Sequence, residues 1–356
     1  MSWEGWVALV ALAVAVVGLV LVLDLRRRPE RAAGPVTEAG SEGPAGVVAD
    51  RVAFVANPSK PGYAETREAA VRACAERYLP EPLWFETSED DPGRGQAEAA
   101  LAAGAALVVA VGGDGTVRSV ATALAGSGVA MAVLPQGTGN LLALNLDIPS
   151  ERTAALRVAL GRQERVIDVG RLTENRSDGS AGREHVFLIA AGVGFDASMV
   201  ADADSDLKAR MGWVAYFVAG LRHLGGRRLP VLARTDDGPW EQLRLRSFLV
   251  GNCGRLPAGL NLLPDAVIDD GLHDVAVLDA TAGIVGWAQL LVNVLLQSVG
   301  VRPRVQRVGS IQHLRARTVE VRLRSPQPVQ VDGDIVGPAA GFTTRVDAGA
   351  LVVRVP

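Results

Sequence analysis

Apolar positions follow three different patterns along this chain of 356 residues. Residues 6–23 form one unbroken apolar run. From residue 51 to residue 150, short apolar runs alternate with segments of helical period, which predicts alternating strands and helices. From about residue 166, short stretches rich in β-branched residues predominate, and residues 318–324 alternate as a half-exposed antiparallel strand does. The pattern predicts an N-terminal helix followed by two domains of different architecture.

The first domain, residues 51–150, has the order of elements typical of a doubly wound parallel sheet. Its expected strands cover residues 51–57, 83–87, 106–111 and 129–134, and its expected helices cover residues 65–78, 95–103 and 117–124.

Residues 151–356 are expected to form a mostly antiparallel sandwich or barrel, whose last strand could return to the first domain. Strands are expected at residues 166–172, 186–192, 243–251, 274–278, 318–323 and 329–331. Two apolar helical stretches, residues 211–224 and 284–299, are expected either to pack on this domain or to contact lipid.

The apolar run at residues 6–23 is a candidate membrane anchor. At about 1.5 Å per residue, a helix of this length just crosses a hydrocarbon core of roughly 30 Å. No basic residue precedes the run and three arginines (residues 26–28) follow it, which favours a retained anchor in residues 1–28 over a cleaved signal peptide or a buried helix. The arginines predict a single-pass protein of the cell membrane whose catalytic body is cytoplasmic. Residues 29–50, rich in Pro, Gly, Glu and Ala, are expected to be a flexible linker.

Composition removes several classes of function. With 36 basic and 39 acidic residues the net charge is −3, which gives no indication of nucleic-acid binding. Cys74 and Cys253 have no metal-binding spacing, so a disulfide framework and a zinc site are not expected. The sequence contains no Walker A lysine motif, no GxGxxG loop and no GxSxG elbow, which argues against a P-loop ATPase, a protein kinase and a serine hydrolase.

A glycine-rich turn follows the third expected strand and consists of Gly112, Gly113, Asp114, Gly115 and Thr116. Glycines let the backbone approach a ligand closely, and the free N–H groups of a helix's first turn attract anions. The carboxylate of Asp114 would be out of place beside an anion unless a divalent cation or a ribose hydroxyl shares the site. The turn therefore predicts a nucleotide-phosphate site with a metal, and the alternative is a plain strand-to-helix turn.

Three expected parallel strands end in loops of unusual composition: NPSKPG (residues 57–62), GGDGT (112–116) and PQGTGN (135–140). Ligands of such sheets bind outside the carboxyl ends of the strands, so the three loops are expected to converge on one site. Lys60, in the first loop, is either a phosphate contact or a solvated turn residue.

In its ordered set of motifs the chain resembles the diacylglycerol kinase catalytic superfamily, in the bacterial lipid-kinase branch related to sphingosine and ceramide kinases. The resemblance covers residues 51–356. Its marks are Asn57-Pro58, the GGDGT turn, PQGTGN, LPDA followed by DDG (residues 263–271), and VDGD (residues 331–334). GGDGT alone is shared with NAD kinases and phosphofructokinases, whereas five marks in order are far more specific.

The resemblance implies ATP-dependent phosphoryl transfer to a lipid hydroxyl, between an NAD-kinase-like α/β domain and a β-sandwich domain. Diacylglycerol, giving phosphatidic acid, is the expected substrate. The residues expected to bind the nucleotide are Asn57, Pro58, Ser59, Lys60, Thr87, Gly112, Gly113, Asp114, Gly115, Thr116 and Thr138. The resemblance also implies a Mg²⁺ in the second domain, held by Asp270 and the backbone carbonyls of Val267 and Leu272.

The candidate general base departs from the family pattern. Bacterial members carry a glutamate in VDGE, and the matching residue here is Asp334. Aspartate can accept a proton but is one methylene shorter, and base catalysis requires hydrogen-bond reach. Asp332 and Asp114 are the other candidates, and Asp114 could instead hold the catalytic Mg²⁺.

Three functions remain open on these observations. The first is a membrane-tethered lipid kinase that binds ATP and Mg²⁺. The second is a kinase with a soluble acceptor such as NAD, and the third is a nucleotide-binding but inactive membrane regulator, suggested by the aspartate at position 334. The expected partners are a lipid substrate and the bilayer, and edge strands of the second domain could pair two chains into a homodimer.

Overall fold

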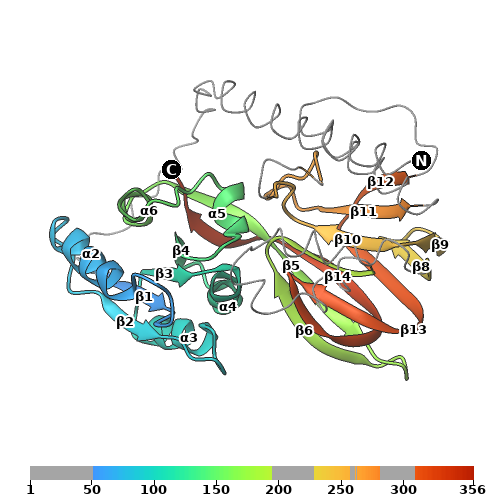
Figure 1. Ribbon diagram of the computed structural model, residues 1–356, viewed down its shortest axis with the longest axis horizontal. Coiled ribbons are helices and arrows are strands. Elements are labelled where there is room, and N and C mark those ends of the chain that lie inside the picture. The colour runs from blue at the N-terminus through green and yellow to red at the C-terminus, as the bar shows by residue number, and fades with distance from the viewer. Residues whose placement is uncertain (1–50, 195–227, 257–260, 262, 281–308) are drawn as a thin grey trace, which may run out of the picture.

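The computed structural model describes residues 51–194, 228–256, 261, 263–280 and 309–356. The described elements form two lobes at opposite ends of the long axis (Figure 1). The predicted anchor (6–23), the linker (29–50) and the two apolar helical stretches (211–224 and 284–299) lie outside the described residues. Among the residues that are described, no helix is both long enough and apolar enough to span a bilayer.

The first lobe contains a parallel sheet in the strand order β4-β3-β1-β2. Its strands are β1 (Val52–Ala56), β2 (Leu83–Glu86), β3 (Leu107–Gly112) and β4 (Ala130–Pro135). Its helices are α2 (Tyr63–Ala75), α3 (Arg94–Ala102), α4 (Asp114–Leu124), α5 (Leu141–Asn145) and α6 (Arg152–Ala159). Strands β1, β3 and β4 are buried over their whole length, as expected for a sheet covered on both faces. The predicted α/β domain is confirmed.

Successive residues of these strands face opposite layers of helices, because side chains alternate along a strand. Val55 and Val108 pack in one core with buried residues of α3 and α4. Phe54 and Val109 pack in a second core with buried residues of α2 and α6. Helix α6 follows residue 150 in the sequence but packs against β4, so it is part of the first lobe.

The second lobe is built from antiparallel strands, as predicted. They are β6 (Ala181–Phe187), β7 (Ala190–Gly194), β8 (Leu229–Thr235), β9 (Glu241–Leu245), β10 (Ser247–Gly251), β11 (His273–Ala280), β12 (Gly309–Ala316) and β13 (Thr318–Val331). Strands β12, β11, β10, β7 and β13 are neighbours in that order, and β8 pairs with the other end of β13. Phe187, Phe248 and Phe342 are fully buried in the core of this lobe.

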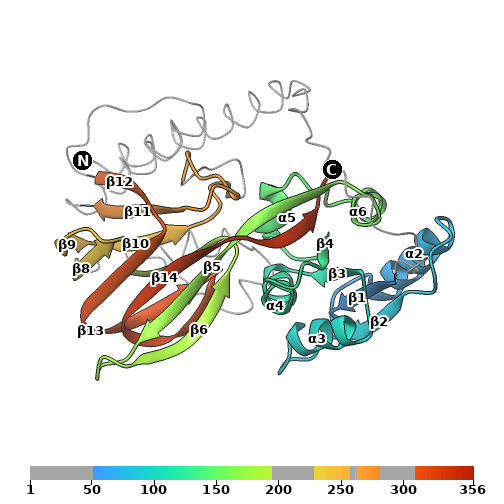
Figure 2. The ribbon, with the colours of Figure 1, turned by 180° about the vertical axis from the view of Figure 1, so that it is seen from behind.

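Two long strands, β5 (Glu164–Asn175) and β14 (Asp334–Arg354), pair with each other and run from one lobe into the other (Figure 2). Strand β14 starts in a hairpin with β13 and ends beside β4, where Val353 pairs with Met131 in parallel. The last strand therefore joins the sheet of the first lobe, and both lobes are parts of one continuous sheet.

Two strands expected from the sequence are each divided in the structure. The stretch 186–192 is interrupted at Leu188 and Ile189, because their amides donate to a carboxylate instead of a neighbouring strand. The stretch 243–251 changes partners at Arg246: β9 before it pairs with β8, whereas β10 after it pairs with β7 and β11. In the first stretch an apolar run continues across the change of strand partner, so composition alone does not reveal the division. In the second stretch the polar–apolar alternation of residues 243–246 gives way to the fully buried strand β10.

Candidate functional site

The glycine turn joins the end of β3 to the start of α4, and Gly113 is the residue that caps the helix. Thr116 is buried and lies against Gly112, where an added Cβ would be 2.7 Å from the Thr116 Oγ1. The first turn of α4, with its N–H groups, lies at the carboxyl edge of the sheet. This is the geometry of an anion-binding helix N-terminus.

A second glycine loop, residues 135–140, packs directly on the first. The amide of Gln136 donates to the carbonyl of Gly112 at 2.8 Å. A Cβ on Gly137 would lie 2.7 Å from the Cα of Gly113, so glycine is required there by space alone. Asn140 closes the loop with two hydrogen bonds to the backbone of Gly137, at 2.7 and 2.8 Å. The two loops form one rigid backbone surface, and the exposed Thr138 lies on it.

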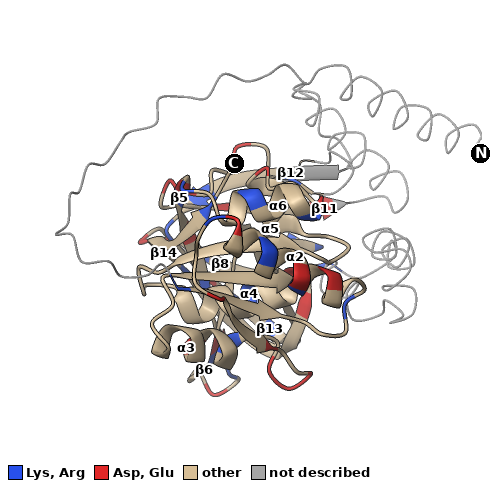
Figure 3. Ribbon diagram, turned by 90° about the vertical axis from the view of Figure 1, so that its left-hand side faces the viewer, with Lys and Arg blue, Asp and Glu red and all other residues tan. Residues whose placement is uncertain are grey.

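The remaining predicted nucleotide residues lie along the same sheet edge. The amide of Asn57 donates to the carbonyl of Val111 at 3.1 Å. Thr87 is buried, and its amide donates to the carbonyl of Ala56 at 2.9 Å. The Asn57 side chain accepts from the amide and the hydroxyl of Ser59, which shapes the turn that contains Pro58 and Lys60. The predicted convergence of the loops is thus observed in the structure. Seen from the end of the first lobe, acidic and basic segments are interspersed (Figure 3).

Asp114 ties α4 to the second glycine loop. Its Oδ1 accepts from the amide of Leu141 at 2.6 Å, and a Cβ on Gly139 would lie 2.7 Å from its Oδ2. Burial raises the pKa of Asp114 and hydrogen bonds from backbone amides oppose that shift, while the negative charge of Asp334 adds to it. The carboxylate of Asp114 is therefore within electrostatic range of the second lobe's candidate base.

The VDGD motif is the hairpin turn between β13 and β14. Asp332 and Gly333 both have positive φ, 47° and 86°, as a two-residue type I′ turn requires. The Asp332 carboxylate accepts three amide hydrogens from the segment 188–190, at 2.9, 2.9 and 3.0 Å. Asp332 was an alternative candidate for the general base. In the structure its carboxylate holds the turn against the segment 188–190. Asp334 follows it, with its side chain 58% exposed.

Arg118 also belongs to this site, although it lies outside the sequence motifs. It follows Asp114 by four residues on α4. Its Nη2 donates to Asp334 Oδ2 at 2.6 Å, and its Nη1 donates to the carbonyl of Val331. Arg118 thereby connects α4 of the first lobe to the turn between β13 and β14 of the other lobe. Its spacing from Asp114 along α4 was the only available signal, since residues four apart share a helix face.

The predicted metal ligands of the second domain are Asp270 and the backbone carbonyls of Val267 and Leu272, and the Asp270 carboxylate has two protein partners in the structure. Asp270 Oδ1 accepts from the amide of Leu272 at 3.1 Å, and its Oδ2 accepts from the guanidinium of Arg315. The side chain of Val267 lies at the surface. The described residues contain no group of three or more acidic, histidine or cysteine side chains arranged to hold a metal ion. Both oxygens of Asp270 thus have protein partners, and Mg²⁺ at these residues stays a prediction.

The loop that contains Asp270 is held instead by Asp168 of β5, whose side chain is buried. Its two carboxylate oxygens accept from the amides of Gly271 and Gly349, at 2.6 and 2.7 Å. A carboxylate that accepts two amide hydrogens can satisfy turns from separate strands at once. No local motif indicated this structural role of Asp168.

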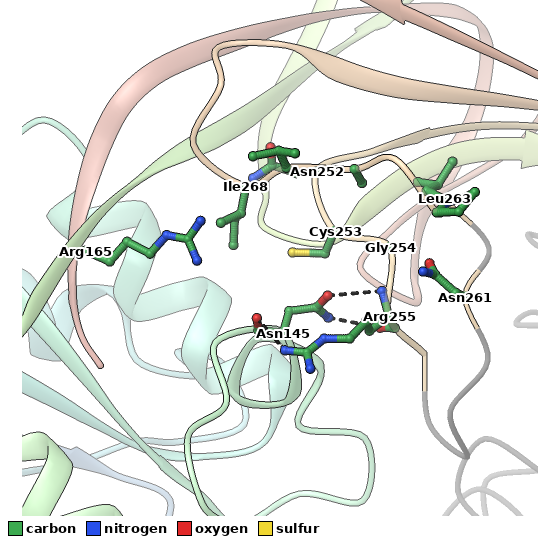
Figure 4. Close-up of a pocket in the computed structure, with 12 residues that line it drawn as sticks. Asn145, Arg165, Asn252, Cys253, Gly254, Arg255, Asn261, Leu263 and Ile268 are labelled. Atoms are coloured by element: carbon green, nitrogen blue, oxygen red, sulfur yellow. Dashed lines mark hydrogen bonds between the residues drawn. The ribbon is translucent and has the colours of Figure 1, made fainter. Parts of the chain in front are cut away.

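A cavity of about 270 Å³ lies between α5 and the segment 252–268 (Figure 4). Arg165 extends into it, and the side chain and backbone of Asn145 are hydrogen-bonded to Arg255. The cavity is linked to the turn between β13 and β14 through Leu188. The thiol of Cys253 donates to the Leu188 carbonyl, and the Leu188 amide donates to Asp332. The predicted nucleotide residues do not line this cavity.

Comparisons with known proteins agree with this geometry. Residues 51–172 match the diacylglycerol kinase catalytic domain, and residues 189–355 match the YegS C-terminal NAD kinase beta sandwich-like domain. The chain is 34% identical over 320 residues to a Pseudomonas aeruginosa (strain UCBPP-PA14) protein named "Probable lipid kinase YegS-like", covering 86% of this chain and 95% of the relative. A Pseudomonas putida protein of the same name is 32% identical over 261 residues, with 72% and 79% covered.

Among solved structures, a diacylglycerol kinase from Bacillus anthracis str. Sterne superposes with a TM-score of 0.67. The identity is 20%, and the match covers 86% of this chain and 97% of that one. At this identity the likeness concerns the fold: an α/β lobe followed by a β-sandwich lobe.

Proposed function

We propose, from the premise that this chain belongs to the diacylglycerol kinase catalytic superfamily and is a lipid kinase, that it phosphorylates diacylglycerol to phosphatidic acid. The proposal depends on one observation above all. Asp334 of the second lobe is bound by Arg118, which lies on the same helix as Asp114 and the phosphate-binding turn. A proton acceptor and an anion-binding turn on opposite sides of a lobe junction suit transfer between two different substrates.

The first lobe supplies the ATP site in this proposal. The first-turn N–H groups of α4 face the phosphates, and the two glycine loops let the backbone approach them closely. Asn57 and Thr87 border the same edge and are positioned for the rest of the nucleotide. Family membership implies ATP as the phosphoryl donor.

In the transfer step, the lipid hydroxyl oxygen attacks the γ-phosphorus and the bond from that phosphorus to the bridging oxygen breaks. ADP leaves with the electron pair, and the hydroxyl proton passes to the carboxylate of Asp334. Phosphoryl transfer depends mostly on positioning and charge stabilisation. A shorter carboxylate can therefore serve, provided that it is held firmly in place.

A divalent cation, which we take to be Mg²⁺, supplies neutralising charge to the phosphates when bound. Asp114 is the residue that would hold it. Burial raises the pKa of Asp114, and a cation beside the carboxylate would favour its ionised form. In the second lobe, by contrast, Arg315 neutralises Asp270, and no metal is proposed there.

The acceptor is a membrane lipid, which gives the N-terminal run its place in the proposal. Residues 6–23 would anchor the chain in the cell membrane, with the two lobes on the cytoplasmic side. A flexible linker at residues 29–50 would keep the enzyme near the bilayer and raise the local concentration of its substrate.

The test is phosphoryl transfer from γ-labelled ATP by the full chain in detergent micelles. Separate reactions contain diacylglycerol, monoacylglycerol, ceramide or sphingosine, and one detergent-free reaction contains NAD. We expect labelled phosphatidic acid. Label in a different lipid refutes the assigned acceptor, and label in NAD refutes a lipid acceptor altogether. ATP binding without any transfer identifies an inactive regulator.

Two variants test the assigned residues in the same assay. Asp114→Ala should lose ATP binding measured by calorimetry. Asp334→Ala should keep ATP binding and lose turnover by about 10²- to 10⁴-fold, the range for removal of a general base. Full turnover in Asp334→Ala would contradict its assignment as the base.

A further inference from the structure

Arg118 lies on α4 at the junction of the two lobes. It lies four residues after Asp114, so the two side chains share one face of α4. Its side chain is only 19% exposed, against 58% for its partner Asp334. The guanidinium is therefore largely removed from water at the point where the two lobes meet.

The arginine contacts the catalytic turn at two points. One nitrogen donates to Asp334 Oδ2 at 2.6 Å, and another donates to the carbonyl of Val331, at the end of β13. The first bond fixes the carboxylate, and the second fixes the strand end that precedes the turn. The planar guanidinium can make both bonds at once, whereas a lysine ammonium would act as a point charge.

Charge gives the second reason for an arginine at this position. Burial raises the pKa of Asp114, and the negative charge of Asp334 raises it further. Burial likewise raises the pKa of Asp332, and the positive charge of Arg118 opposes that shift. Arg118 thus places a positive charge beside Asp334 and Asp332, at a junction where ATP brings still more negative charge.

We infer that Arg118 is a positioning residue for phosphoryl transfer, which holds the Asp334 carboxylate against the nucleotide helix. The assignment rests on the proposed function. Aspartate has one methylene less reach than glutamate, and the two-point contact with Arg118 compensates by fixing the turn that presents it. Arg118 acts through Asp334 and does not itself bind the nucleotide.

The experiment compares steady-state kinetics of the full chain with Arg118→Ala, Arg118→Lys, Asp334→Ala and the double variant, using the lipid that the wild type phosphorylates. We expect Arg118→Ala to lower kcat by roughly 10- to 100-fold, as loss of an orienting partner commonly does, with the KM for ATP unchanged. Arg118→Lys should recover part of kcat, because it restores the charge but not the fork. The double variant should match Asp334→Ala, since Arg118 has nothing to position once the carboxylate is gone.

Arg94→Ala is the matched control, because it removes an arginine from an exposed helical ion pair with Glu98. It should leave kcat and the melting temperature close to those of the wild type. Three results would overturn the inference while leaving the lipid kinase intact: an unchanged kcat in Arg118→Ala, a raised KM for ATP, or multiplicative losses in the double variant. A wild type that phosphorylates no lipid overturns the proposed function and this inference together.

Discussion

Replacing Gly137 by alanine should separate the two glycine loops and impair phosphoryl transfer. The added Cβ would lie 2.7 Å from the Cα of Gly113 and 2.9 Å from the Asn140 Oδ1. Backbone at Gly113 cannot rotate away as a flexible side chain would. Ordinary contact begins near 3.4 Å, so the two backbones must separate by about 0.7 Å, the difference between 3.4 and 2.7 Å.

Two magnitudes follow from that displacement. Overpacking of this kind costs about 1–3 kcal/mol of stability. Misplacement of reacting groups by about 1 Å can cost roughly 10²-fold in rate, so a shift of most of an ångström should lower turnover by about one to two orders of magnitude. Because the variant remains folded, the loss of turnover should exceed any loss caused by unfolding.

Gly104→Ala is the control with a comparable loss of stability. Gly104 has φ of +75° and no atom within 4 Å of an added Cβ, so alanine there is strained but not crowded. The strain costs about 1–2 kcal/mol. Gly104 lies before β3, at the end of the strand opposite the glycine turn.

Lipid phosphorylation, ATP calorimetry and thermal unfolding should be measured on both variants. We expect similar melting temperatures, with ATP affinity and turnover reduced only in Gly137→Ala. Wild-type turnover in Gly137→Ala would refute the view that contact between the two loops shapes the phosphate site. Equal losses of turnover in both variants would attribute the effect to stability.

Three further outcomes are expected. Asp332→Asn turns one acceptor oxygen into a donor facing an amide of the segment 188–190, so it should cost about 1–3 kcal/mol by denaturant unfolding and lower kcat; unchanged stability would contradict the anchoring role. Burial lowers the pKa of His273 to about 4, so protonation of this histidine favours the unfolded chain. The folded protein keeps its full stability above pH 6.5, the pKa of the histidine in the unfolded chain, and loses about 3 kcal/mol as the pH falls towards 4. Parallel stability–pH curves for wild type and His273→Asn would contradict this. Without nucleotide, Mg²⁺ should raise the melting temperature of Arg315→Met, where Asp270 loses its arginine partner, more than that of the wild type; equal shifts in the two proteins would contradict the view that Arg315 blocks a cation from Asp270.

The first lobe was predictable because each of its elements has a distinct pattern within a short stretch of sequence. A strand buried on both faces must be apolar throughout, as β3 is, and the glycine turn that follows it has few other physical uses. The convergence of the nucleotide loops then follows from parallel strand order alone. Even Gly137 could be noted in the sequence, although its contact with Gly113 could not.

The junction between the lobes was less predictable, since it depends on pairs of residues far apart in the chain. Arg118 and Asp334 are separated by 216 positions, and neither lies in a pattern that indicates the other. Asp270 likewise pairs with Arg315, 45 positions away, and no sequence pattern indicates that contact. The change of strand partner at Leu188 and Ile189 falls within an apolar run and also leaves no local trace in the sequence.

Strand β14 links the order of synthesis to the order of assembly. It begins at Asp334, and its far end completes the sheet beside β4. Until residue 354 has left the ribosome, β4 keeps an open edge able to pair with other chains. A fragment ending at residue 172 would carry that edge permanently, so the nucleotide lobe should aggregate when expressed alone and remain soluble when residues 334–356 are supplied in trans.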